Sequence, residues 1–200
     1  MKRIVLASNN AGKLREFSAL LAPRGWTLIP QGELGIPEAE EPHPTFIENA
    51  LAKARHASQC SGLPALADDS GICTVALGGA PGVYSARYAA MNGHEKSDAA
   101  NNRFLVGQLA AHADKRAYYY AALVFVRSAA DPQPLIGEGL WWGEVLEVPR
   151  GQGGFGYDPH FFIPALGKTV AELSAEEKNG RSHRALALQA LMGKLDQTQP

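Results

Sequence analysis

The chain has 200 residues, of which 46% are hydrophobic and 20% charged, an ordinary globular composition. A chain of this length can bury a sizeable core without disulfides. The net charge is -1, from 19 basic and 20 acidic residues, which argues against broad electrostatic capture of nucleic acid or of an anionic membrane. A local basic pocket for phosphates stays compatible with this balance, so we expect neither a nucleic-acid nor a membrane partner.

The two cysteines, Cys60 and Cys73, form no CxxC motif and no metal-ligand spacing. A disulfide framework is therefore not expected, and a reducing compartment fits best. The apolar run at residues 4–7 is too short for a signal-peptide core or a membrane span. These features predict a cytoplasmic protein.

The first half of the chain predicts an α/β core. Residues 3–7 form an apolar strand, followed by a polar turn at residues 8–10. Apolar residues then recur at helical spacing from Leu14 to Leu21, and Pro23 and Gly25 end this helix. A second strand follows at residues 26–29, and the strand–helix–strand order is typical of α/β folds.

After an acidic loop over residues 32–44, Thr45 and Glu48 form a capping box that opens a helix at residues 46–59. Gly62 stands where a helix C-terminus favours glycine. Residues 63–67 predict a strand that ends at Asp68.

In the second half, residues 97–111 predict a helix, and residues 116–127 and 135–148 predict an antiparallel pair of strands. A glycine-rich loop over residues 151–158 and a short apolar run at 161–163 follow. The last helix is expected over residues 183–195.

The turn Ser8-Asn9-Asn10-Ala11-Gly12-Lys13 lies between a predicted strand and a predicted helix. Such a turn directs backbone N–H groups and the positive end of the helix dipole toward an anion, and Lys13 adds a full charge. It is not a Walker P-loop, because Ala7 replaces the first glycine and Leu14 follows Lys13. The alternative is an N-capped surface turn with a solvated lysine.

Asp68-Asp69-Ser70-Gly71 directly follows four apolar residues, at the end of a strand where α/β sheets bind ligands. Adjacent strand residues point to opposite faces, so one aspartate can face a metal while the other supports the backbone. With a glutamate from the acidic loop, these carboxylates suffice for Mg²⁺, which also takes waters and phosphates as ligands. The alternative is a simple Asx-turn.

Three further groups of residues carry candidate functional side chains. Lys53, taken alone, is explained as a solvated lysine on a helix. The segment Gly151-Gln152-Gly153-Gly154-Phe155-Gly156 is spelled like a dinucleotide fingerprint, but Tyr157-Asp158-Pro159 follows where a helix should open, so Phe155 and Tyr157 suit stacking on a flat base instead. Ser182-His183-Arg184 at a predicted helix start, with Lys178 upstream, offers donors for ring carbonyls or phosphate, or else simply caps the helix.

Taken together these motifs resemble one family, the RdgB-type inosine triphosphate pyrophosphatases. The matching segments are collinear over residues 4–195 and run from Ser8–Glu16 through Thr45–Ala54, Asp68–Gly71, Pro81–Tyr88 and Gly153–Pro159 to Ser182–Arg184. The resemblance implies an elongated α/β fold with a central mixed β-sheet flanked by helices. It also implies a single domain over residues 1–200 that can form two lobes with the active site in the cleft between them, and a homodimer.

The implied activity is the Mg²⁺-dependent hydrolysis of ITP, dITP or XTP between the α and β phosphates, which keeps deaminated purines out of DNA and RNA. By position, residues 8–13 and Lys53 would hold the triphosphate; Asp69 would be the proton acceptor and, with Glu41, the metal site; and Asp68 would support them. Ser70 would contact the substrate, and the base would be enclosed and recognised by Phe155, Gly156, Tyr157, Asp158, Lys178, His183 and Arg184. The family often carries a third aspartate where this chain has Val75.

Two other functions stay open at this point. One is a nucleotide-binding sensor that does not turn over, against which the presence of both Asp68 and Asp69 argues. The other is a pyrophosphatase for modified pyrimidine nucleotides on a related fold. A panel of nucleoside triphosphates separates all three.

Overall fold

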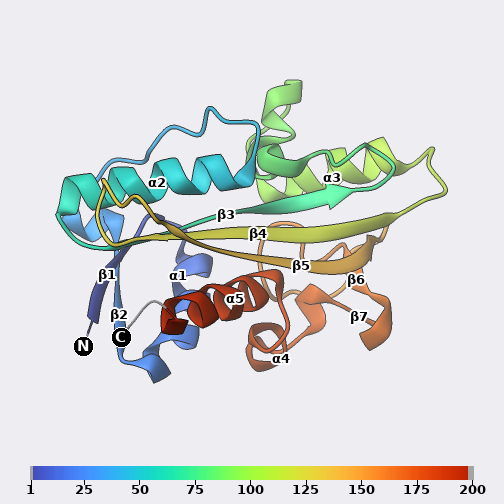
Figure 1. Cartoon of the computed structure of the whole chain (residues 1–200). Helices are drawn as coiled ribbons and strands as arrows, with labels where there is room; N and C mark the ends of the chain where they lie inside the picture. The colour runs from blue at the N-terminus through green and yellow to red at the C-terminus, as the bar shows by residue number, and fades with distance from the viewer. Residues whose placement is uncertain (1, 198–200) are drawn as a thin grey trace. The chain divides into compact units, whose positions relative to one another are not determined.

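The computed structural model describes residues 2–197 (Figure 1). Its sheet has seven strands in the order β2-β1-β3-β4-β5-β6-β7. Strand β1 pairs in parallel with β2 and β3, while β6 pairs antiparallel with β5 and β7, so the sheet is mixed as expected. The strands are β1 Lys2–Leu6, β2 Trp26–Pro30, β3 Ala65–Thr74, β4 Arg116–Val126, β5 Leu135–Val145, β6 Phe161–Ile163 and β7 Lys168–Thr169.

The helices begin and end close to the signals that the sequence carries. Asn10, Thr45 and Ser97 cap the first three, each accepting a hydrogen bond from a backbone N–H of the first turn. Gly62 ends α2 with a φ of 69°, the left-handed conformation that glycine adopts without strain. The helices are α1 Ala11–Leu21, α2 Phe46–Ser61, α3 Asp98–Leu109, α4 Ala175–Asn179 and α5 His183–Gln197, and short 3₁₀ segments lie at Ala22–Arg24, Gln31–Leu34, Gly82–Arg87, Ala90–Asn92, Pro164–Leu166 and Val170–Glu172. None of the helices within residues 2–197 is long and apolar enough to cross a bilayer.

The chain divides into two compact units. The first unit contains the N-terminal stretch through Asp69, the segment Ala121–Gly139 and the stretch from His183 onward. The second unit contains Ser70–Tyr120 and Leu140–Ser182. The long strands β3, β4 and β5 therefore each contribute residues to both units. The sequence-based expectation of one domain with a cleft between two lobes stays a prediction.

In the first unit, α2 covers one face of the sheet, and α1 and α5 lie on the other (Figure 1). The strand residues alternate accordingly. Leu66 packs in the cluster formed with α1 and α5, whereas Ala65 and Ala67 pack in the cluster formed with α2. Continuing this alternation by two residues directs Asp68 toward α1 and α5, and Asp69 toward α2.

One sequence-based expectation about β3 is wrong. The strand does not end at Asp68, and Asp68–Gly71 does not form an Asx-turn, because β3 continues to Thr74. In the second unit, the N–H of Ile72 donates to the Ser85 hydroxyl at 2.9 Å. A Cβ at Gly71 would collide with this same Ser85 hydroxyl. Glycine therefore lets a neighbouring segment pack directly against the strand, and this tertiary contact overrides the turn preference of an Asp-Ser-Gly sequence.

Candidate active site

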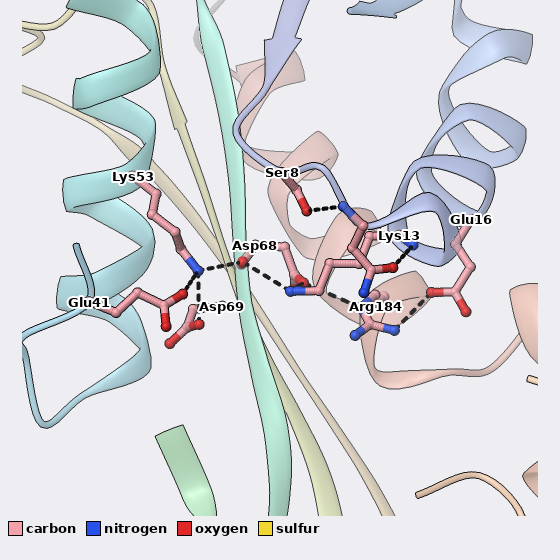
Figure 2. A network of polar contacts seen from close by, with 9 residues as sticks. Ser8, Lys13, Glu16, Glu41, Lys53, Asp68, Asp69 and Arg184 are labelled. Atoms are coloured by element: carbon pink, nitrogen blue, oxygen red, sulfur yellow. Dashed lines mark hydrogen bonds and ion pairs between the residues drawn. The ribbon is translucent and has the colours of Figure 1, made fainter. Parts of the chain in front are cut away.

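Asp68 is the buried centre of a charged cluster on the face of α1 and α5 (Figure 2). Its Oδ2 lies 2.7 Å from the Lys13 Nζ and 3.4 Å from the Arg184 Nε, and its side chain has no exposed surface. Arg184 also binds Glu16 of α1 at 2.9 Å. Burial alone would raise the pKa of Asp68, but the charges of Lys13 and Arg184 hold this pKa well below its usual range. Asp68 is therefore ionised and holds two cations in place.

Asp69 faces α2 and shares a single cation with a second carboxylate (Figure 2). The Lys53 Nζ lies 2.9 Å from the Asp69 Oδ1 and 2.8 Å from the Glu41 Oε1. Burial raises the pKa of Asp69, and the charge of Glu41 adds to this rise against the opposing effect of Lys53. Burial acts to lower the pKa of Lys53, but two neighbouring carboxylates outweigh it and raise that pKa. Lys53 thus stays charged, while Asp69 gains affinity for a proton.

The second carboxylate oxygen of Asp69, Oδ2, has a different environment from Oδ1. The Oδ2 is buried and accepts no hydrogen bond from any of the residues that the structure describes. A buried carboxylate oxygen without a donor is costly to maintain, and such groups call for a functional explanation. An oxygen of this kind can accept a proton from water or coordinate a cation.

The backbone of β3 connects the two faces. The Leu66 carbonyl accepts a hydrogen bond from the Ala7 N–H at 2.9 Å, where β1 ends. The Asp68 carbonyl lies two residues further along this edge of β3, beyond the end of β1. It accepts hydrogen bonds from the Lys53 Nζ at 3.0 Å and the Lys13 Nζ at 3.4 Å instead. Because β1 ends early, both lysines reach the same carbonyl oxygen from opposite faces of the strand.

The turn at residues 8–13 has the predicted strand–turn–helix form. The Ser8 Oγ accepts from the Asn10 N–H at 3.1 Å, and the Asn10 side chain accepts from the Lys13 N–H at 3.0 Å. Asn9, Asn10 and Ala11 are exposed. The turn thus presents small side chains and the N-terminus of α1 beside the Lys13–Asp68 pair. Anion binding at this turn stays a prediction.

In the second unit, Asp158 organises the glycine-rich loop. Its Oδ2 accepts from the Lys178 Nζ at 2.9 Å and from the Phe155 N–H at 3.0 Å, and its Oδ1 accepts from the Tyr119 hydroxyl at 3.0 Å. The Lys178 ammonium also lies 4.8 Å from the centre of the Phe155 ring. Gly154 has a φ of 73°, and a Cβ there would collide with the Asp158 carboxylate, so glycine is required. The structure therefore brings Phe155, Asp158 and Lys178 together.

The sequence-based grouping of base-binding residues spans both units. His183 and Arg184 begin α5 in the first unit, whereas residues 155–158, Lys178 and Ser70 belong to the second. Both His183 and Arg184 are buried. The roles expected for these residues stay predictions.

Glu16, which binds Arg184, was given no role from the sequence. It follows Lys13 by three residues on α1, and this helical spacing places both on one face. That spacing is the signal that could have identified Glu16.

The model of the Ham1 family matches residues 4–194. The chain belongs to the Ham1 family. It is 71% identical to a protein of Ralstonia nicotianae named dITP/XTP pyrophosphatase, over 98% of this chain and 97% of that protein. A protein of Bordetella pertussis with the same name is 66% identical, over 100% of this chain and 94% of that protein.

Solved structures of Ham1 proteins share the fold. The HAM1 protein from Coxiella burnetii superposes with a TM-score of 0.89 at 44% identity, covering 99% of this chain and 100% of that chain. The Ham1 protein of Staphylococcus aureus gives a TM-score of 0.85 at 38% identity, with the same coverage. These neighbours and the mixed sheet confirm the fold class, and the family match confirms the resemblance found in the sequence.

Proposed function

We propose that this Ham1-family chain hydrolyses the deaminated purine nucleotides ITP, dITP and XTP to the monophosphate and pyrophosphate, and so keeps them out of DNA and RNA. The names of the relatives at 71% and 66% identity support this substrate class. The observation that carries the proposal is Asp69, a buried carboxylate with one oxygen lacking a donor within residues 2–197. It lies beside two lysines, Lys13 and Lys53, whose amino groups meet at one carbonyl oxygen.

We propose Mg²⁺ as the cofactor, held by Asp69 and Glu41. Magnesium prefers carboxylate, water and phosphate oxygens and rarely needs a full cage of protein ligands. The residues present fit this requirement, because the Asp69 Oδ2 lacks a donor among the described residues and the Glu41 carboxylate shares the Lys53 ammonium with Asp69. Across residues 2–197, no group of three or more His, Cys, Asp or Glu side chains could hold a metal. When bound, the ion would neutralise charge on the phosphates.

The protein groups would divide the remaining work. Asp69, with its raised pKa, would accept the proton of the attacking water as the α–β anhydride bond breaks and pyrophosphate leaves. Lys13, Lys53 and the turn at residues 8–12 would bind and orient the triphosphate, whose several negative charges need such neutralisation. Asp68 would hold Lys13 in position and take no proton, because its pKa is lowered.

The purine would be recognised by its exocyclic groups. A 6-oxo group accepts a hydrogen bond where adenine's amino group would oppose a donor with a donor, and leaving a buried donor unpaired costs about 1–3 kcal/mol. GTP shares the 6-oxo group, so discrimination against GTP would depend on its 2-amino group. We assign base contacts to residues 155–158, Lys178, His183 and Arg184, and a substrate contact to Ser70. We further propose that the chain is cytoplasmic and forms a homodimer. Light scattering after size-exclusion chromatography tests the dimer.

The test is a panel of ITP, dITP, XTP, GTP, ATP and modified pyrimidine triphosphates, with pyrophosphate release as the readout. We expect ITP and XTP to be cleaved far faster than ATP and GTP, and EDTA to abolish the activity. Comparable rates on ATP and ITP would refute the selectivity, and saturable ITP binding without pyrophosphate release would indicate a sensor. In K13A we expect a lower kcat/KM, and an unchanged value would remove Lys13 from the site.

A further inference from the structure

Helix α3 grips the base loop, defined here as residues 153–158, at one peptide on each side of Gly156. The Gly156 N–H donates to the Asp98 Oδ2 at 2.8 Å, and the Gly156 carbonyl accepts from the Asn102 Nδ2 at 2.8 Å. Asp98 and Asn102 are four residues apart on α3, so both side chains lie on one face of the helix. We name this pair the α3 clamp.

The contact with Gly156 fixes the side-chain amide of Asn102 and leaves its oxygen without a donor among residues 2–197. Its amide nitrogen also donates to the Asp98 carbonyl at 2.9 Å, so both partners of the nitrogen are carbonyl oxygens. A reversed amide would set oxygen against oxygen, which fixes the orientation. Its Oδ1 is then buried and accepts no hydrogen bond from residues 2–197. A fold tolerates such an unsatisfied acceptor where the position of a neighbouring group matters.

The clamp acts on the peptide that follows Phe155. On the other side of this residue, the Phe155 N–H is bound by the Asp158 Oδ2 at 3.0 Å. The backbone of Phe155 is therefore fixed before and after its Cα, and its ring lies 4.8 Å from the Lys178 ammonium. An aromatic ring held in this way can stack on a flat base without first being ordered, which strengthens binding.

We propose that Asp98 and Asn102 are positioning residues that hold Phe155 ready to stack on the purine and so set the KM for ITP. This inference rests on the proposed function, because it takes residues 155–158 as the part of the chain that contacts the base. Loss of the clamp disorders the ring before substrate arrives, so it weakens binding and leaves the bond-breaking step nearly unchanged. Neither residue touches the substrate itself.

The first test compares N102A with N101A. Asn101 is the matched control, because it lies on the same helix, is similarly buried, and also holds backbone groups, the Ala89 N–H and the Ala86 carbonyl. We expect N102A to raise the KM for ITP about tenfold, which is the effect expected from the loss of one buried hydrogen bond. The kcat should stay within about twofold of the wild-type value. N101A should lower the melting temperature about as much as N102A does, but without this change in KM.

The second test uses Asp98, which is exposed, so its variants keep the proposal testable if N102A does not fold. In D98A the amide proton of Gly156 should exchange with solvent at least tenfold faster and the KM should rise. D98N retains an oxygen acceptor and should restore both values. This exchange measurement does not depend on activity.

Three results separate a failure of the α3 clamp from a failure of the proposed function. A wild-type protein without activity on ITP overturns both the proposed function and the clamp. An active wild type, with the KM of N102A equal to that of N101A, overturns the clamp alone. Unchanged exchange at Gly156 in D98A likewise overturns the clamp and leaves the proposed function standing.

Discussion

Replacing Asp68 by asparagine tests whether this carboxylate holds two cations in place. The exposed fractions of the Asp68, Lys13 and Arg184 side chains are 0%, 16% and 7%. In D68N, Lys13 and Arg184 lose this shared counter-charge. Breaking a buried ion pair costs about 3–5 kcal/mol of unfolding free energy. Because Arg184 keeps Glu16 at 2.9 Å, we expect the lower end, about 3 kcal/mol, which corresponds to a fall in Tm of about 6–12 °C.

The contribution of Asp68 to the unfolding free energy depends on pH, and the direction of its pKa shift fixes how. The pKa of Asp68 is lower in the folded protein than the value of about 3.9 in an unfolded chain. A carboxyl whose pKa falls on folding stabilises the protein above its unfolded pKa, and this stabilisation is lost as the pH falls toward the folded pKa. The difference in unfolding free energy between wild type and D68N should therefore be constant from about pH 7 to 5 and shrink below about pH 4.

Urea unfolding followed by tryptophan fluorescence at several pH values measures this difference. K13M is the companion variant. Asp68 there keeps Arg184, so the loss of unfolding free energy should be smaller than in D68N. A difference between wild type and D68N below about 1 kcal/mol at pH 7, or one that grows on acidification, would refute the assignment of Asp68 as the ionised centre of the cluster.

Further predictions concern the other face of β3 and the glycines. D69N should lower kcat/KM for ITP by about 10²–10⁴-fold, the contribution of a positioned general base, and a mild loss contradicts that role. K53Q leaves Asp69 and Glu41 without their shared cation, which raises the folded pKa of Asp69. Relative to wild type, the Tm of K53Q should therefore rise as the pH is lowered from 7 to 5, and it should also rise when Mg²⁺ is added. A Tm that does not respond to Mg²⁺ argues against the metal site. Gly71→Ala should lower the unfolding free energy by about 2 kcal/mol, because a Cβ would collide with the segment at residues 82–85. Gly107→Ala, on an open helix surface, should raise the unfolding free energy by about 1 kcal/mol. Urea unfolding measures both changes.

The elements of the fold were predictable where the signals are local. Thr45 and Gly62 bracket α2 because capping and left-handed termination depend on a few neighbouring residues. The alternation of strand side chains likewise placed Asp68 and Asp69 on opposite faces before any tertiary contact was known. Parallel pairing of β1 with β3 is not a local property, and the strand–helix–strand order predicted only the α/β class.

The sequence failed where distant segments decide the conformation. Asp68–Gly71 has the composition of a turn, yet a close approach at Gly71 and charged partners at Asp68 keep it extended. Arg184, one of those partners, is 116 residues away in the chain, and no periodicity links the two positions. The sequence therefore grouped Arg184 with the base-binding residues without indicating its ion pairs with Asp68 and Glu16.

Two adjacent aspartates acquire opposite acid–base properties because one strand separates their surroundings. Asp68 faces two cations and its pKa falls, whereas Asp69 shares one cation with Glu41 and its pKa rises. Lys13 and Lys53 are both bound to carboxylates. On the proposed function, a triphosphate that draws Lys53 away deprives Asp69 and Glu41 of their shared counter-charge. Asp69 and Glu41 would hold a metal ion that supplies that charge, so the arrangement would favour binding of metal and triphosphate together over binding of either alone.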